Sequence, residues 1–280
     1  MMANRPGRTK FTEYKIPTSG DDYLGATILR KPLPPTEGPN KIMVICHGLL
    51  NTQYSRVVRT LATGLPYHAC IFDFRGNGQS SGSTRYGNHF EEVDDLCHVV
   101  EYLRNVLHFQ VEVIMGHSKG ASAALLYSAR YADVPYVIDL SGRYDMTKAP
   151  MLNFTPQQQE ELATQGETVW KHYGLDGDRP YIVRKTDLEN LTADRMEPVR
   201  CLDFNKVQVL IVHGEDDVVV PVEEGRKYYD VLLNGPVLNG QPDDRLTLKV
   251  LPKTSHVFTE PHEQALLLEA VGSWLEPRMR

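Results

Sequence analysis

A serine lies at the centre of the pentapeptide Gly116-His117-Ser118-Lys119-Gly120. An apolar run precedes it and small residues follow it, which predicts a strand, a sharp turn and a helix. Glycine at positions 116 and 120 removes side chains that would collide across such a turn, so the Ser118 hydroxyl would be exposed at its apex. The sequence therefore predicts that Ser118 is a catalytic nucleophile in a nucleophile elbow, rather than an ordinary helix N-cap.

A serine nucleophile needs a general base and an acid that orients the base. His256 follows the last predicted strand, and Asp217 follows the strand before it, so the chain order is nucleophile, acid, histidine. Of the ten histidines, His256 alone lies in the loop after the last strand, and it is the predicted base. The acid stays open at this point, because three other carboxylates compete with Asp217: Glu215, Asp216 and Asp145.

Stabilisation of the reacting carbonyl oxygen needs two backbone N–H groups already in place. The amide of Lys119 at the start of the predicted helix would be one donor. The other donor is expected in the segment 47–50, where Gly48 permits a tight turn and the Leu49 amide is the candidate. The glycine-rich stretch 73–82 lacks the glycine at position 81 that a nucleotide-binding pattern requires, so it is interpreted as a structural turn that supports the site.

The sequence that must position these residues alternates between short apolar runs, which predict strands, and stretches with apolar residues at helical spacing, which predict helices. This alternation is typical of an α/β fold with a mostly parallel sheet. The first two predicted strands alternate in polarity and are expected to form an antiparallel edge, and the later ones read as buried central strands. Apolar residues recur at helical spacing in residues 90–107 and again after Pro261. Strands are predicted at 10–16, 22–30, 41–46, 67–73, 111–116, 134–140, 207–213 and 246–251.

One segment breaks this alternation, because more than sixty residues without a strong strand signal separate the strand ending at Leu140 from the next. It includes a helix capped by Thr155 and opened by Pro156. A structureless loop of that length is unusual in a compact domain, so we interpret residues 143–205 as a cap or lid inserted into a single domain of residues 1–280. Surface decoration is the alternative. Six residues of this segment are candidates for the pocket wall, although most of them are expected to pack within the cap itself: Met151, Leu152, Phe154, Trp170, Tyr173 and Tyr181.

Composition narrows the classes of protein further. The chain has 280 residues, 41% of them hydrophobic, and a formal net charge of −6, which disfavours nucleic acid or an anionic membrane as the main partner. No apolar run approaches the ~18 residues of a membrane span. The four cysteines lack metal-binding spacing, and Cys46 and Cys70 lie in apolar strands. A cytoplasmic protein without metal or cofactor is expected, and its oligomeric state is left open.

In its motifs and their order, the chain resembles the α/β-hydrolase superfamily, most closely the serine hydrolases related to cinnamoyl and feruloyl esterases and to serine aminopeptidases. The resemblance implies an α/β-hydrolase fold, a mostly parallel eight-stranded sheet with helices on both faces and an inserted cap. It also implies that Asp217 is the triad acid. The motifs are His47-Gly48, Asp73-x-x-Gly76-x-Gly78-x-Ser80, Gly116–Gly120, His213-Gly-x-x-Asp217-x-x-Val-Pro221 and Ser255-His256-x-Phe258.

The expected function is hydrolysis of a small-molecule carboxylic ester through an acyl-enzyme, with small, aromatic or medium acyl groups. Three alternatives use the same fold: hydrolysis of an amide or peptide, hydrolysis of a lipid monoester, and ligand binding by a receptor-like protein with little turnover.

Overall fold

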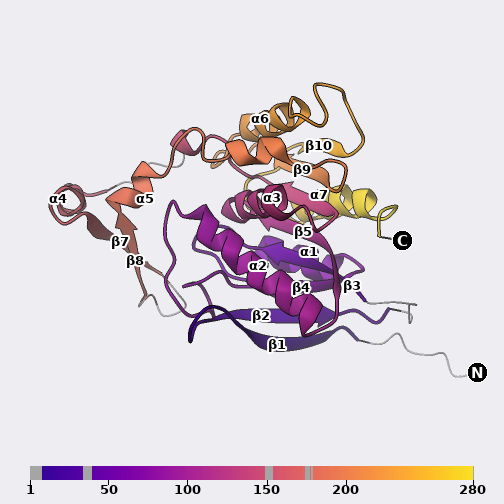
Figure 1. The fold of residues 1–280 in the computed structure, drawn as a ribbon, viewed down its shortest axis with the longest axis horizontal. Helices are drawn as coiled ribbons and strands as arrows, with labels where there is room; N and C mark the ends of the chain where they lie inside the picture. The colour runs from indigo at the N-terminus through magenta and orange to yellow at the C-terminus, as the bar shows by residue number, and fades with distance from the viewer. Residues whose placement is uncertain (1–7, 34–39, 149–153, 174–176, 178, 280) are drawn as a thin grey trace, which may run out of the picture.

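The computed structural model describes residues 8–33, 40–148, 154–173, 177 and 179–279 (Figure 1). Its centre is an eight-stranded sheet with the strand order β1-β2-β4-β3-β5-β6-β9-β10. Every one of the eight predicted strands overlaps one of these. The strands are β1 (Lys10–Pro17), β2 (Tyr23–Arg30), β3 (Lys41–Cys46), β4 (His68–Phe72), β5 (Gln110–His117), β6 (Tyr136–Leu140), β9 (Gln208–Gly214) and β10 (Leu246–Leu251).

The sheet is antiparallel only at one edge. β1 pairs with β2, and β2 with β4, in antiparallel register. All other neighbours in this sheet run parallel. The predicted antiparallel edge is therefore confirmed, and the carboxyl ends of six strands from β3 to β10 meet at one side of the sheet, where ligands bind in open α/β folds.

Helices cover both faces, as the resemblance implied (Figure 1). One face packs against α2 (His89–Asn105), α3 (Lys119–Tyr131) and α6 (Val222–Leu233). The other packs against α1 (Arg56–Gly64) and α7 (Pro261–Leu275). The alternation of side chains along a strand divides the two cores: within β3, Val44 belongs to the first core and Ile45 to the second.

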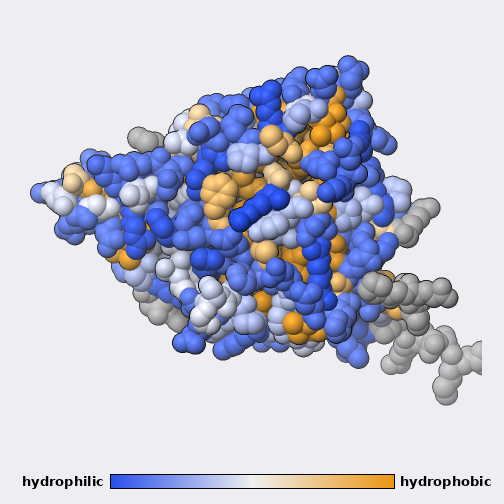
Figure 2. Space-filling view, viewed as in Figure 1, coloured by the Kyte–Doolittle hydropathy of each residue, from blue (hydrophilic) through white to orange (hydrophobic). Residues whose placement is uncertain are grey.

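The outer surface differs from these cores. On the face shown in Figure 2, hydrophilic residues cover most of the surface, and a group of hydrophobic ones lies near the middle.

Cys46 and Cys70 are buried free thiols inside the sheet, where burial raises the pKa of both, so they act as small hydrophobic residues. Within the described residues, no helix is both long and apolar enough to cross a bilayer.

The segment between β6 and β9 contains strands that the sequence did not predict. β7 (Glu167–Tyr173) and β8 (Arg179–Arg184) form a separate antiparallel pair, flanked by α4 (Pro156–Thr164) and α5 (Lys185–Glu189). Figure 1 shows this unit projecting from one end of the molecule. The predicted start of α4 is confirmed, since the Thr155 hydroxyl accepts a hydrogen bond from the Gln158 amide in a capping box. Two short 3₁₀ turns complete the segment, Met146–Lys148 and Glu197–Cys201.

Candidate active site

Ser118 lies in the tight turn between β5 and α3. Its backbone has φ 55° and ψ −119°, which is strained for a residue with a side chain. A Cβ at Gly116 would lie 2.1 Å from the carbonyl oxygen of Gly120, and a Cβ at Gly120 would lie 2.4 Å from that of His47. Both glycines are therefore required for the turn, as the sequence predicted.

His256 and Asp217 are joined by a short hydrogen bond. The His256 Nδ1 atom lies 2.7 Å from Asp217 Oδ2, and both residues are buried. The other carboxylate oxygen accepts hydrogen bonds from the amides of Val219 (2.9 Å) and Val220 (2.8 Å). Burial alone would raise the pKa of Asp217, but hydrogen bonds from His213 and His256 lower it well below its usual range. Asp217 is thus a carboxylate at neutral pH.

The three other acids left open by the sequence do not contact His256. Glu215 and Asp216 are exposed. The Asp145 carboxylate lies 3.6 Å from the ammonium groups of Lys148 and Lys227. The structure therefore brings Asp217 alone of these four acids to the histidine.

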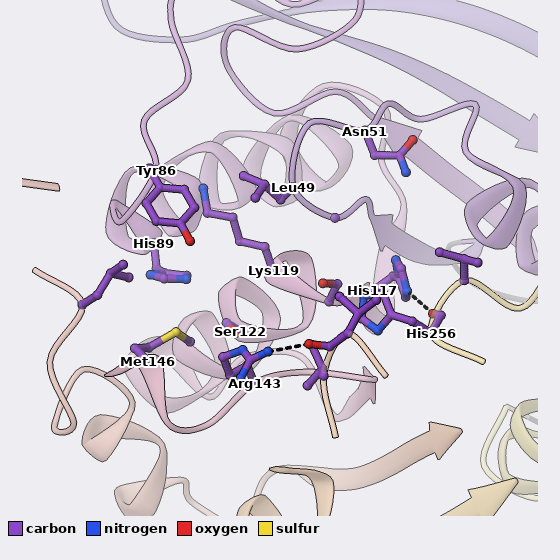
Figure 3. Close-up of a pocket in the computed structure, with 16 residues that line it drawn as sticks. Leu49, Asn51, Tyr86, His89, His117, Lys119, Ser122, Arg143, Met146 and His256 are labelled. Atoms are coloured by element: carbon purple, nitrogen blue, oxygen red, sulfur yellow. Dashed lines mark hydrogen bonds between the residues drawn. The ribbon is translucent and has the colours of Figure 1, made fainter. Parts of the chain in front are cut away.

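Ser118 and His256 line the same cavity, together with His117 (Figure 3). Among the described residues, no hydrogen bond joins the Ser118 hydroxyl to the His256 ring, a contact that in unliganded enzymes often tightens only around substrate. His117 Nε2 donates to the backbone carbonyl of His256 (2.8 Å). Burial and the neighbouring His256 lower the pKa of His117 to about 3. His117 is therefore neutral and holds the His256 loop.

The two predicted oxyanion donors border this cavity. Lys119 is the first residue of α3, where a helix leaves its amides without intrahelical acceptors. No described residue accepts a hydrogen bond from the Leu49 amide. The loop that carries Leu49 is tied down by His47, whose Nε2 accepts from the Phe74 amide (3.0 Å) while Nδ1 contacts the Gly48 carbonyl (2.7 Å).

The glycine-rich stretch 73–82 is a structural turn, in agreement with its interpretation from sequence. The buried Asp73 carboxylate accepts hydrogen bonds from the Gln53 amide (2.6 Å), the Gln53 side chain (2.8 Å) and the Gln79 amide (2.9 Å). It thereby connects this turn to the loop after β3.

The sequence did not predict one ion pair that lies beside Ser118. Lys119 Nζ lies 2.6 Å from Glu92 Oε1, and both side chains are almost fully buried. Burial raises the pKa of Glu92 to about 7, against the opposing effect of Lys119. Glu92 comes from α2, so only the packing of α2 against α3 reveals the pair.

The cavity has a volume of about 350 Å³ and mostly apolar walls. From residues 143–205 it takes Arg143, Met146 and Leu191. No described candidate for the pocket wall is among them. Trp170 and Tyr173 each pack edge-on against Tyr181, forming a small core of the β7–β8 unit instead, and Phe154 packs against the same core. Met151 and Leu152 lie outside the described residues.

Comparison with known proteins agrees with this fold. Residues 37–173 match the family described as serine aminopeptidase, S33. Est1E from Butyrivibrio proteoclasticus has the same fold with a TM-score of 0.71 and 18% identity, over 95% of this chain and 98% of that one. The chain has the α/β-hydrolase fold.

Three curated relatives are more similar in sequence. The uncharacterized protein YqkD of Bacillus subtilis is 29% identical over 223 residues, which cover 78% of this chain and 67% of YqkD. A monoacylglycerol lipase of Mycolicibacterium smegmatis is 26% identical, over 86% of this chain and 90% of the lipase. The lysophosphatidylserine lipase ABHD12 of Danio rerio is 26% identical over 64% of this chain, but the match spans only 43% of ABHD12.

Proposed function

We propose that the protein hydrolyses carboxylic esters, with Ser118 as nucleophile, His256 as general base and Asp217 as the acid that orients it. The observation that carries the proposal is the 2.7 Å contact between His256 Nδ1 and Asp217 Oδ2 in the cavity that Ser118 lines. A carboxylate can only accept a hydrogen bond, so Nδ1 carries the proton and Nε2 can take the proton of the serine.

The reaction would proceed in two halves. Ser118 Oγ attacks the ester carbonyl while His256 takes its proton, and the Leu49 and Lys119 amides donate to the developing oxyanion. Collapse releases the alcohol, which receives the proton from His256, and leaves an acyl-enzyme. Water then attacks the acyl group by the same steps. These residues need no metal or cofactor for this chemistry.

The apolar cavity of about 350 Å³ favours small, aromatic or medium acyl groups. We further propose that residues 143–205 act as a cap, because Met146 and Leu191 from this segment line the cavity. A lipid monoester is the second candidate substrate, supported by the names of two relatives, the monoacylglycerol lipase and the lysophosphatidylserine lipase.

A fluorophosphonate probe tests the nucleophile and separates an active hydrolase from a receptor-like protein. We expect the wild type and Ser128→Ala to be labelled and Ser118→Ala not to be, since the Ser128 hydroxyl in the same helix donates to the Ala124 carbonyl instead. Ester hydrolysis should fall roughly 10⁴-fold in Ser118→Ala. Labelling of Ser118→Ala equal to that of the wild type would refute the assignment, and an ester, amide and monoacylglycerol panel would rank the substrates.

A further inference from the structure

The loop after β6 places a buried cation in the wall of the cavity. Arg143 is 9% exposed and lines the same cavity as Ser118 and His256. Figure 3 shows its side chain across the view from Leu49, and Ser122 and Met146 line the same cavity. A buried guanidinium is costly unless it is paired or well hydrogen-bonded.

The guanidinium of Arg143 is only partly satisfied by the protein. One nitrogen, Nη2, donates to the carbonyl oxygen of Val219 at 2.7 Å. Among the described residues, no other hydrogen bond and no ion pair involves this side chain. A guanidinium has five N–H donors, so most of them remain for a ligand.

The other charges around the cavity do not compensate Arg143. No aspartate or glutamate is found among the described residues that line it. The ammonium group of Lys119 is already paired with Glu92. Burial and nearby cations lower the pKa of His89 to about 3, and His117 is neutral for a similar reason. Arg143 is therefore the uncompensated cation of the cavity.

The backbone holds Arg143 in place before any ligand binds. The amide of Gly142 donates to Asp139 Oδ1 (2.7 Å), and the Tyr228 hydroxyl donates to the carbonyl of Arg143 (2.8 Å). The next two amides donate to Glu224 Oε2 at 3.1 and 2.8 Å. A charged group fixed in this way loses little entropy when it binds a ligand.

We propose that Arg143 binds an anionic group of the substrate, so that the preferred substrates are esters that carry a carboxylate or a phosphate. The inference rests on the proposed ester hydrolysis at Ser118. The planar guanidinium suits either anion, because two parallel N–H groups can meet two oxygens. If Arg143 only anchors Val219, its loss will affect charged and neutral esters alike.

Two matched substrate pairs test the proposal and separate the two anions. The first compares 4-nitrophenyl hemiglutarate with 4-nitrophenyl pentanoate, and the second compares 1-butyryl glycerol 3-phosphate with monobutyrin. We expect the wild type to prefer the anionic member of at least one pair by tenfold or more in kcat/KM. That ratio should fall at least tenfold in Arg143→Met and be partly retained in Arg143→Lys.

Arg195→Met is the matched control, because Arg195 also donates to a single carbonyl, that of Gly87 (3.3 Å), but does not line the cavity. It should keep the wild-type ratio within twofold. A wild-type ratio near one in both pairs would overturn the proposal. So would an equal loss on both members of a pair in Arg143→Met.

Binding separates failure of this inference from failure of the proposed function. Monobutyl glutarate should bind Ser118→Ala at least tenfold more tightly than Ser118→Ala/Arg143→Met, measured by calorimetry. If that holds while the wild type hydrolyses none of the four esters, the anion site stands and the ester chemistry is wrong. If the neutral esters are hydrolysed and the two affinities are equal, the anion site is wrong and the hydrolysis stands.

Discussion

His213 Nε2 lies 3.4 Å from Asp217 Oδ2, the same oxygen that contacts His256. The ring also donates to the carbonyl of Val220 at 2.7 Å, and it is fully buried. Burial by itself lowers the pKa of His213, but its hydrogen bonds to Asp217 and Val220 raise it overall. The Asp217 carboxylate therefore lies between two histidines. The His213 ring also holds the loop after β9 through its hydrogen bond to Val220.

The first prediction concerns this acid. Asp217→Asn should lower kcat for ester hydrolysis roughly 10³- to 10⁴-fold, because an amide no longer fixes the proton on His256 Nδ1. Asp216→Asn is the neighbouring control, since Asp216 is exposed, and it should keep kcat within about twofold. A larger loss in Asp145→Asn than in Asp217→Asn would assign the acid to the loop after β6 instead.

A second prediction compares two glycines. Gly116→Ala should lower the free energy of unfolding by about 2 kcal/mol or more, because its Cβ would lie 2.1 Å from a backbone oxygen. Gly272→Ala should raise it by about 0.5–1 kcal/mol, since this helical glycine has its nearest neighbour at 3.6 Å. Urea denaturation measures both, and destabilisation of similar size in the two variants would contradict the packing described for the elbow.

The third prediction concerns pH and Glu92. Its pKa is raised to about 7 in the folded protein, above the value of about 4.3 for an unfolded chain. Between these two values the folded state binds more protons, so this group makes the free energy of unfolding fall as pH rises through the window. Glu92→Gln should remove that contribution, on the order of a few kcal/mol across the window.

Urea denaturation from pH 4.5 to 7.5 provides the measurement. The difference between wild type and Glu92→Gln should change with pH, whereas the difference for Glu101→Gln, an exposed residue of the same helix, should stay constant. A constant difference for both variants would mean that Glu92 is ionised throughout.

A fourth prediction tests which residues limit the length of the acyl group. Met146→Trp should lower kcat/KM for a 4-nitrophenyl octanoate at least tenfold relative to the acetate, because Met146 lines the cavity. Trp170→Phe should leave that ratio unchanged, since Trp170 packs against Tyr181 and is not among the residues that line the cavity. The reverse result would place the aromatic core of the β7–β8 unit in the acyl site.

Much of this architecture could be predicted from sequence because strong local patterns specify it. Buried central strands such as β9 are continuous apolar runs, and the elbow depends on glycines at fixed spacing around Ser118. β7 was not predicted, because its side chains are largely exposed and apolar residues do not alternate with polar ones along it. Trp170 was a candidate for the pocket wall because of its residue type alone, although its neighbours in space decide its role.

Charged groups of the site were the least predictable. Asp216 and Asp217 are adjacent residues of the same type, so the sequence alone does not distinguish them. The direction of the chain after β9 is what turns Asp217 toward His256. Glu92 and Lys119 are 27 residues apart and on different helices. Arg143 carries no local signal for the cavity, because the position of its backbone depends on the hydrogen bonds of Gly142 to Asp139 and of Tyr228 to the Arg143 carbonyl.

Because the backbone at Ser118 is strained, stability and activity favour different residues at this position. Glycine would adopt φ 55° and ψ −119° more easily than serine and so relieve a strain on the order of 1–3 kcal/mol. Selection for thermal resistance alone would therefore favour glycine at position 118, and any library screened only for heat tolerance should enrich it. Serine at this position is the less stable choice, and its presence points to a demand on the hydroxyl group itself.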